Sequence, residues 1–511
     1  MIYPFRLFLE KSASLRFVSL LAVLLAWPAA GAQAGAGLAG KVSGILGRYA
    51  QNPADWGIQV RSLETGKDLL HTNAGKLYMP ASNLKLLVTA AALDGLGSEF
   101  RYRTTVLAAG RLERSTGVLH GDLVVVGSGD PTISDRFYAD LNTVWDSLAL
   151  AVSQAGITRV EGSLVADNRL FEPPYLSEGW GWEDLMWWYA APVSALSFND
   201  NCIDVEVFPS RRVGEAPEMR IRPQGSSVRF SNRAQTVASR AESRLVISRQ
   251  TPGGEVSLGG GIYSGSLGYL EHVAVDDPAR FAANAFADAL SRAGIRLDGE
   301  VRVVGPGSPD SSWLDRSPAI VAQHVSVPLK DIVKIINKHS HNFYAEQLLF
   351  TLGARLGAGG SFEKGVEVEK RFLGRIGVVT RQLRIQDGSG LSRLNLVSTE
   401  MFVRLLAHLD GHRERETFIA SLPVGGKDNG VQLLRNTAAE GRLFAKTGYI
   451  SNVMALSGYT STADGERVVF SILGNNWLIP RERARRLIRD VCVAVAESRR
   501  ERKIAEEEVK P

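Results

Sequence analysis

Cysteine is scarce in this sequence of 511 residues, which contains only Cys202 and Cys492. Two thiols in a chain of this length do not make a disulfide framework, and their separation leaves open whether they pair. The eight histidines are scattered, and none has the His/Cys spacing of a zinc site. We therefore expect no metal and no cofactor.

Long hydrophobic runs are absent after the first 34 residues. Residues 1–34 have the pattern of a secretory signal: a basic start, a short apolar core at 17–27 and a small-residue cleavage site at 32–34. The apolar core is too short to span a bilayer comfortably. We expect a secreted chain without a membrane span, which is periplasmic in a cell with two membranes.

A large excess of charge is also missing, because 59 basic residues face 54 acidic ones. No basic run with interleaved aromatic residues is present, so we expect no nucleic-acid binding. The composition, 45% hydrophobic and 22% charged, is that of a folded protein, and the length suggests two or three domains.

The segment Pro80 to Lys85 precedes a helix that is apolar almost all round and therefore buried. Leu86 to Leu93 is rich in Leu and Ala, and a pair of glycines ends it. Ser82 and Lys85 are three residues apart and share one face, which places a candidate base beside a hydroxyl nucleophile. Alternatively, Ser82 caps the helix and Lys85 reaches the surface.

The pattern of expected helices and strands changes twice along the rest of the chain. A lead-in helix at 35–50 and strands at 56–63 and 68–71 come before the Ser82 helix. From residue 101, short strands are expected at 123–126, 162–166, 203–207, 245–248, 272–275 and 301–304, with one helix at 278–293. After a Gly/Pro/Ser-rich boundary at 305–312, we expect helices at 328–338, 343–356, 361–376, 399–409 and 480–498, and strands at 442–449, 453–459 and 467–473.

Two further polar clusters follow Ser82-x-x-Lys85, namely Ser340-His341-Asn342 and Lys446-Thr447-Gly448. Alone, the first could be a turn or helix cap, and the second an exposed strand ending in a bulge. Together, in this order and context, the three match the motif set of penicillin-recognising serine acyl-transfer enzymes.

Acyl transfer needs a base, a proton donor for the leaving group, an oxyanion cradle and a grip on the substrate. Lys85, held neutral by burial and by nearby cations, would accept the Ser82 proton. Ser340 would relay it to the leaving nitrogen. Asn342 would orient Lys85 and bind the substrate amide.

The strand that contains the third motif would bind the substrate. Lys446 would add positive potential, and Thr447 a hydroxyl, for a substrate carboxylate, while Gly448 would allow a close approach. The backbone N–H groups of Ser82 and Tyr449 would form the oxyanion hole. The Gly-rich segment 387–393 either lines this site or is a plain turn.

With these motifs, the sequence resembles the class C, low-molecular-mass penicillin-binding proteins, which are D-alanyl-D-alanine carboxypeptidases that also act as endopeptidases. The resemblance covers nearly the whole mature chain. It includes the segments 127–132, 180–185, 197–201 and 387–392. It separates the chain from β-lactamases, which lack the large insertion between the first two motifs.

The resemblance implies an α+β fold, with a β-lactamase/transpeptidase-like domain in which helices flank an antiparallel sheet. Residues 35–100 and 316–498 would form this domain. Residues 101–315 would form a large, mostly β insertion, and 499–511 a charged tail.

The resemblance also implies cleavage of the terminal D-Ala of peptidoglycan stem peptides, and of D-Ala–diaminopimelate cross-links, through an acyl-enzyme on Ser82. Stem peptides and β-lactam antibiotics are the expected partners, with penicillins as inhibitors. Family members use an acidic residue of the insertion to hold the diaminopimelate amine, and Asp167 is the candidate here. The alternatives are a β-lactamase and a non-catalytic peptidoglycan-binding scaffold.

Overall fold

The computed structural model describes residues 37–48, 54–251, 253–308 and 313–500. The expected signal at 1–34 and residues 501–511 of the tail lie outside these ranges. The helices are α1 (Leu38–Gly47), α2 (Lys85–Leu96), α3 (Thr143–Gln154), α4 (Pro278–Arg292), α5 (Leu329–Lys338), α6 (Asn342–Leu356), α7 (Phe362–Arg375), α8 (Thr399–Asp410), α9 (Arg415–Ser421) and α10 (Arg481–Ala496).

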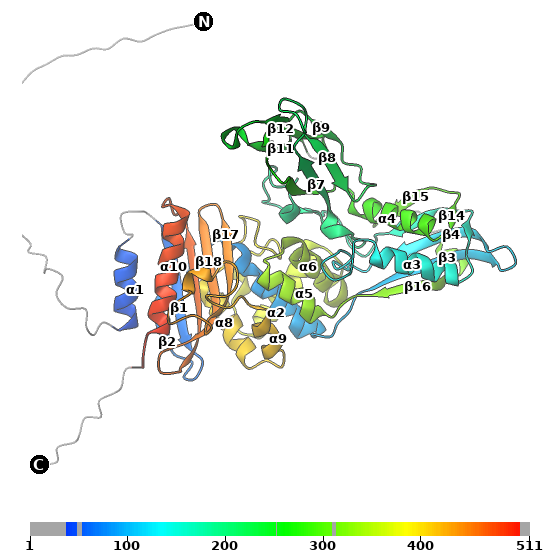
Figure 1. The fold of residues 1–511 in the computed structure, drawn as a ribbon. Helices are drawn as coiled ribbons and strands as arrows, with labels where there is room; N and C mark the ends of the chain where they lie inside the picture. Colours follow the sequence, from blue (N-terminus) through cyan, green and yellow to red (C-terminus); the bar gives the residue numbers. More distant parts are fainter. Residues whose placement is uncertain (1–36, 49–53, 252, 309–312, 501–511) are drawn as a thin grey trace, which may run out of the picture. The chain divides into compact units, whose positions relative to one another are not determined.

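An antiparallel sheet of five strands joins the two ends of the described chain, in the order β17-β18-β19-β1-β2. On one face it packs against α1 and α10, which lie side by side in Figure 1. On the other face it packs against α8 and the helices around α2. Its strands are β1 (Asp55–Ser62), β2 (Asp68–Thr72), β17 (Phe444–Ile450), β18 (Val453–Ser461) and β19 (Arg467–Asn475). The expected α+β fold is confirmed.

Helix α2 lies in the middle of the helical layer and packs against α5, α6 and α7. Every residue from Lys85 to Leu93 is buried, as its apolar sequence predicts. The helix ends before Gly97, which has a φ of 80° and so adopts a backbone conformation that favours glycine.

Residues between α2 and α5 form three further sheets and a core of their own. Their strands are β3 (Arg103–Glu113), β4 (Val118–Val126), β5 (Arg159–Val160), β6 (Leu164–Asp167), β7 (Cys202–Phe208), β8 (Glu218–Arg222), β9 (Phe230–Asn232), β10 (Gln235–Val237), β11 (Leu245–Arg249), β12 (Val256–Tyr263), β13 (Tyr269–Ala274), β14 (Arg296–Leu297), β15 (Val301–Val304) and β16 (Ala319–Val325). Because β16 pairs with β3, we propose that the inserted part continues to about residue 326 rather than 315.

The expectation of one helix in this part is wrong, because α3 also lies here and packs against α4. Its buried apolar residues recur at helical spacing and are Val144, Trp145, Leu148, Ala149 and Val152. The segment lies among many short strands, and the strand-rich context concealed that period.

Both cysteines are free thiols, which settles the open question of their pairing. Cys202 lies in β7 and Cys492 in α10, and burial raises the pKa of each thiol above its ordinary value. We expect neither to react with an aromatic disulfide reagent in the folded protein, and both to react after denaturation, as counted by thiolate release. Rapid reaction of either thiol before unfolding would contradict this burial.

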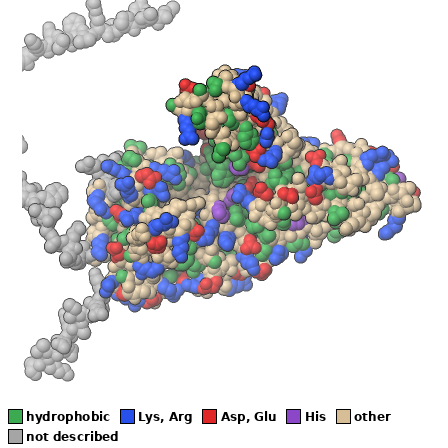
Figure 2. All heavy atoms as spheres, viewed as in Figure 1, with side chains coloured by type: hydrophobic (Ala, Val, Ile, Leu, Met, Phe, Trp, Pro, Cys, Tyr) green, Lys and Arg blue, Asp and Glu red, His purple; other side chains and the backbone are tan. Residues whose placement is uncertain are grey.

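The surface carries both signs of charge. On the face shown in Figure 2, basic and acidic side chains are interspersed. Among the described residues, no helix has the length and apolar character needed to cross a bilayer.

Candidate active site

The first motif forms a strained turn at the start of α2. Ser82 lies in the 3-10 turn η1 (Ala81–Leu84), and Ala81 before it has a φ of 46°. A non-glycine residue in this region costs about 1–3 kcal/mol, and such strain is typical of functional sites. The Ser82 side chain remains partly accessible, whereas Lys85 is fully buried.

The Lys85 amine donates three hydrogen bonds. Its Nζ lies 2.9 Å from Ser82 Oγ, 2.7 Å from Asn342 Oδ1 and 2.7 Å from the Ser389 carbonyl oxygen. Three acceptors match the three protons of an ammonium group, and a neutral amine could accept the Ser82 proton instead. The Asn342 amide also donates to the Tyr189 carbonyl, at 2.8 Å, which fixes its orientation.

Burial lowers the pKa of Lys85 to about 7. The carboxyl groups of Glu346 and Asp387 act in the opposite direction. Burial thus acts on the Lys85 pKa as expected. The expected lowering by nearby cations is not found at Lys85, where the charged neighbours that shift the pKa are carboxyl groups; the repulsion between Lys85 and Lys446 lowers the pKa of Lys446 instead. The shift leaves a large fraction of Lys85 neutral near pH 7, as a general base requires.

The second and third motifs meet at Ser340. This residue connects α5 to α6 with a φ of 57°, and its Oγ accepts a hydrogen bond from Lys446 Nζ at 2.9 Å. Lys446 lies in β17 and is fully buried. Burial, followed by the charge of Lys85, lowers its pKa well below the ordinary value.

The third contact joins β17 to the turn that contains Ser82. A Cβ added to Gly448 would lie 2.7 Å from the Pro80 carbonyl oxygen and 3.1 Å from the Asn83 nitrogen. Only glycine allows this approach. One contact thus connects each pair of motifs: Lys85–Asn342 joins the first to the second, Lys446–Ser340 the second to the third, and Gly448–Pro80 the third to the first.

Replacement of Gly448 by alanine should therefore separate β17 from η1. We expect acylation of the site to slow by about 10²-fold, since displacements of about 1 Å in a catalytic site have effects of this size. The measurement is the rate of labelling by a fluorescent penicillin. Gly374→Ala is the control, because a Cβ there meets nothing within 4 Å. Equal rates for both variants would contradict the close contact.

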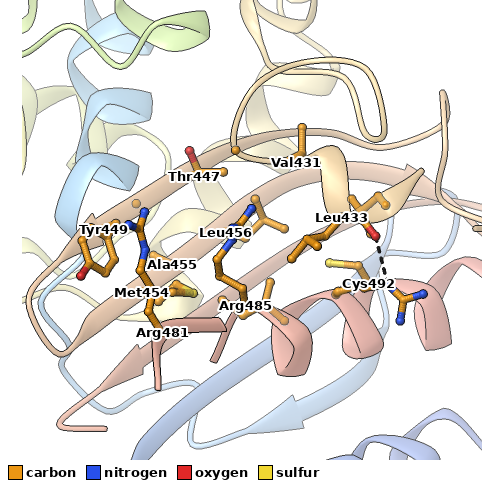
Figure 3. Close-up of a pocket in the computed structure, with 15 residues that line it drawn as sticks. Val431, Leu433, Thr447, Tyr449, Met454, Ala455, Leu456, Arg481, Arg485 and Cys492 are labelled. Atoms are coloured by element: carbon orange, nitrogen blue, oxygen red, sulfur yellow. Dashed lines mark hydrogen bonds between the residues drawn. The ribbon is translucent and has the colours of Figure 1, made fainter. Parts of the chain in front are cut away.

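Thr447 of the third motif and Tyr449, the residue after it, face away from Lys446. Because side chains alternate along a strand, Thr447 and Tyr449 lie on the α10 side of β17. There they line a pocket of about 250 Å³ together with Arg481 and Arg485 of α10 (Figure 3). The Arg481 guanidinium lies 4.0 Å from the centre of the Tyr449 ring. β17 is an edge strand whose first residues pair with the segment at Pro423 and Val424; an extended ligand could pair with its outer backbone edge only beyond Ala445.

Asp167 lies at the end of β6, and its carboxylate accepts two hydrogen bonds from the Arg169 guanidinium, both at 2.8 Å. Among the described residues, it makes no hydrogen bond to the other predicted site residues. Its proposed role in holding an amine remains a prediction.

The Gly-rich turn at 387–393 lines the site, since the Ser389 carbonyl oxygen accepts a hydrogen bond from Lys85 Nζ. Gly390 has a φ of 81°, and a Cβ there would lie only 1.9 Å from the Ala81 carbonyl oxygen. Sequence reasoning missed Glu346, a fully buried acid on α6 whose carboxyl group accepts hydrogen bonds from this turn. The signal in the sequence was its position four residues after Asn342, which puts Glu346 on the same helix face as that site residue.

Comparison with known proteins places this geometry in a family. Residues 38–498 match the model of the D-Ala-D-Ala carboxypeptidase 3 (S13) family. The chain is 34% identical over 446 residues to the D-alanyl-D-alanine carboxypeptidase of Actinomadura sp. strain R39, covering 85% of this chain and 80% of that protein. It is 25% identical over 419 residues to D-alanyl-D-alanine carboxypeptidase DacB of Haemophilus influenzae, covering 81% and 84%.

The fold agrees. The crystal structure of penicillin binding protein 4 from Haemophilus influenzae superposes with a TM-score of 0.76 at 23% identity, covering 89% of this chain and 99% of that one. A β-lactam complex of that protein superposes with a TM-score of 0.71 at 22% identity, covering 88% and 97%.

The fold and the family model together define a serine DD-peptidase. The chain belongs to the D-Ala-D-Ala carboxypeptidase 3 (S13) family, within the low-molecular-mass class C penicillin-binding proteins.

Proposed function

We propose that Ser82 is the nucleophile and Lys85 the general base of this carboxypeptidase. The proposal is carried by one observation: the buried Lys85 amine lies 2.9 Å from Ser82 Oγ and is held there by Asn342 and Ser389. Burial favours the neutral amine, which can accept a proton from the hydroxyl.

In the acylation step, Ser82 Oγ attacks the carbonyl carbon of the penultimate D-Ala and its proton passes to Lys85. The backbone N–H groups of Ser82 and Tyr449 stabilise the oxyanion. The C–N bond then breaks, and Ser340, hydrogen bonded to Lys446, relays the proton from Lys85 to the leaving amine, so that Lys85 is neutral again and Ser340 keeps its hydroxyl. Water hydrolyses the resulting ester and restores Ser82.

The substrate we propose is the stem peptide of peptidoglycan. Its terminal carboxylate would bind at the outer edge of β17, between the Thr447 hydroxyl on one face of the strand and Lys446 on the other, with Gly448 allowing the peptide to approach. The D-Ala–diaminopimelate cross-link presents the same acyl group and would be cleaved by the same step. Asp167 would receive the free amine by exchanging its contacts with Arg169. This substrate places the enzyme outside the cytoplasmic membrane, in the periplasm of a cell with two membranes, in agreement with the signal pattern at 1–34.

Chromatography of peptide products tests the proposal. Wild-type protein should release D-Ala from a pentapeptide ending in D-Ala-D-Ala and split a cross-linked dimer, while Ser82→Ala should do neither. D-Ala release that persists in the variant would remove Ser82 from its role. Rapid turnover of penicillin without D-Ala release would instead indicate a β-lactamase. Asp167→Asn should lower cleavage of the dimer more than that of a pentapeptide lacking the free amine.

A further inference from the structure

A buried carboxyl group on α6 supports the turn that accepts a hydrogen bond from the Lys85 amine. Glu346 lies one turn after Asn342 on α6, on the same helix face, and is fully buried. Its Oε2 accepts the Gly388 N–H at 2.8 Å, and its Oε1 accepts the Ser389 N–H at 2.8 Å. A carboxyl group buried at such a position is expensive unless it is hydrogen bonded, and here both oxygens are.

The same turn reaches Lys85. The carbonyl of Ser389 accepts a hydrogen bond from Lys85 Nζ at 2.7 Å, while the N–H of Ser389 donates to Glu346. Helix α6 therefore holds the amine twice, directly through Asn342 Oδ1 and indirectly through Glu346 and Ser389.

Asp387 has a different task, since it shapes the turn from within. Its Oδ1 accepts from the Gly390 N–H and the Asn395 amide, each at 2.8 Å. Its Oδ2 accepts from the Ser392 N–H at 2.7 Å and the Trp180 indole at 2.9 Å. Glu346 is the carboxyl group that fastens the shaped turn to the helix bearing Asn342.

We propose that Glu346 is a positioning residue for acyl transfer, which fixes the Ser389 carbonyl against the Lys85 amine and contributes negative charge beside it. This inference rests on the proposed role of Lys85 as the base.

The charges around Lys85 make the role testable by pH. Glu346 and Asp387 raise the Lys85 pKa against the effect of burial, so loss of the Glu346 charge should lower it further. Burial, followed by Asp387, raises the pKa of Glu346, whereas the N–H groups of Gly388 and Ser389 that donate to its oxygens oppose this shift and favour the carboxylate. The other titratable groups near Lys85 are Lys446 of β17 and His341 before α6, both of which feel the Lys85 charge.

Glu369 of α7 supplies a matched control. It is fully buried like Glu346, and neither carboxyl oxygen has a partner among the described residues. Burial, followed by Glu346 and Asp387, raises its pKa well above the ordinary value, which favours the neutral acid. Glu369→Gln therefore changes a buried acid to an amide without removing a hydrogen bond to the turn.

The experiment measures the second-order rate of acylation by a fluorescent penicillin from pH 5 to 9 in wild type, Glu346→Gln and Glu369→Gln. In Glu346→Gln, the amide oxygen still accepts one of the two backbone N–H groups, but the NH₂ group faces the other and cannot accept from it. We expect its maximal rate to fall by about tenfold, and the acidic limb of its profile to move down by about half a pH unit. Glu369→Gln should keep the wild-type limb.

A Glu346→Gln profile and rate equal to those of wild type would overturn the proposal. So would an equal loss of rate in both variants without movement of the limb, because that result indicates packing alone. If Glu346→Gln does not fold by circular dichroism, Glu346→Asp replaces it: the charge stays but the reach shortens, so the rate should fall without a downward movement of the limb. Absence of any adduct in wild type would instead refute the proposed function.

Discussion

Lys85→Arg is expected to slow acylation of Ser82 by about 10³-fold or more, the upper range for loss of a general base. A guanidinium keeps the positive charge but does not give up its proton in proteins, so the charge and the base are separated by this change. The measurement is the acylation rate with a fluorescent penicillin at pH 8, in protein shown to fold by circular dichroism.

The pH profile provides the internal check on this variant. Because burial lowers the pKa of Lys85 to about 7, the wild-type rate should fall as the pH drops below about 7, where the amine is protonated. The residual rate of Lys85→Arg should lack this acidic limb. A variant that retains both the limb and more than a tenth of the wild-type rate would show that another group accepts the Ser82 proton.

Lys446→Ala is expected to slow acylation by about 10²-fold, as removal of a preorganised electrostatic contact does in other enzymes. Ser340 Oγ would lose the donor that lies 2.9 Å away, and the site would lose a buried amine next to the proposed carboxylate subsite. The KM for a D-Ala-D-Ala peptide should rise as well.

Lys330→Ala is the matched control for Lys446. It removes the same kind of side chain from α5, where the Lys330 side chain is 46% exposed and its amine pairs with Glu99. Its rate should stay within twofold of wild type, since exposed ion pairs contribute little. A Lys446→Ala enzyme as fast as this control would exclude a role for the amine in acylation.

The sequence was most informative where local spacing determines contact. Ser82 and Lys85 are three residues apart at a helix start, and the structure places their side chains 2.9 Å apart. The apolar run after them predicts a buried helix, and α2 is buried throughout. The alternation of a strand could also have separated Lys446 and Gly448 from Thr447, because a period of two puts them on opposite faces.

Long-range contacts were beyond local reasoning. Glu346 belongs to a mostly apolar helix, where an acid is normally taken as a surface position. Its burial depends on N–H groups from a turn more than 40 residues later in the chain. For the same reason, the carboxyl groups that oppose the lowering of the Lys85 pKa could not be identified before the turn was placed against α6.

Mass spectrometry of the penicillin-treated protein is the decisive test of Ser82 as the acylated residue. We expect one adduct of the mass of the intact penicillin, located after proteolysis on the peptide that contains Ser82, and no adduct on Ser82→Ala. An adduct on any other peptide, or one that persists in the variant, would contradict the convergence of the three motifs on Ser82.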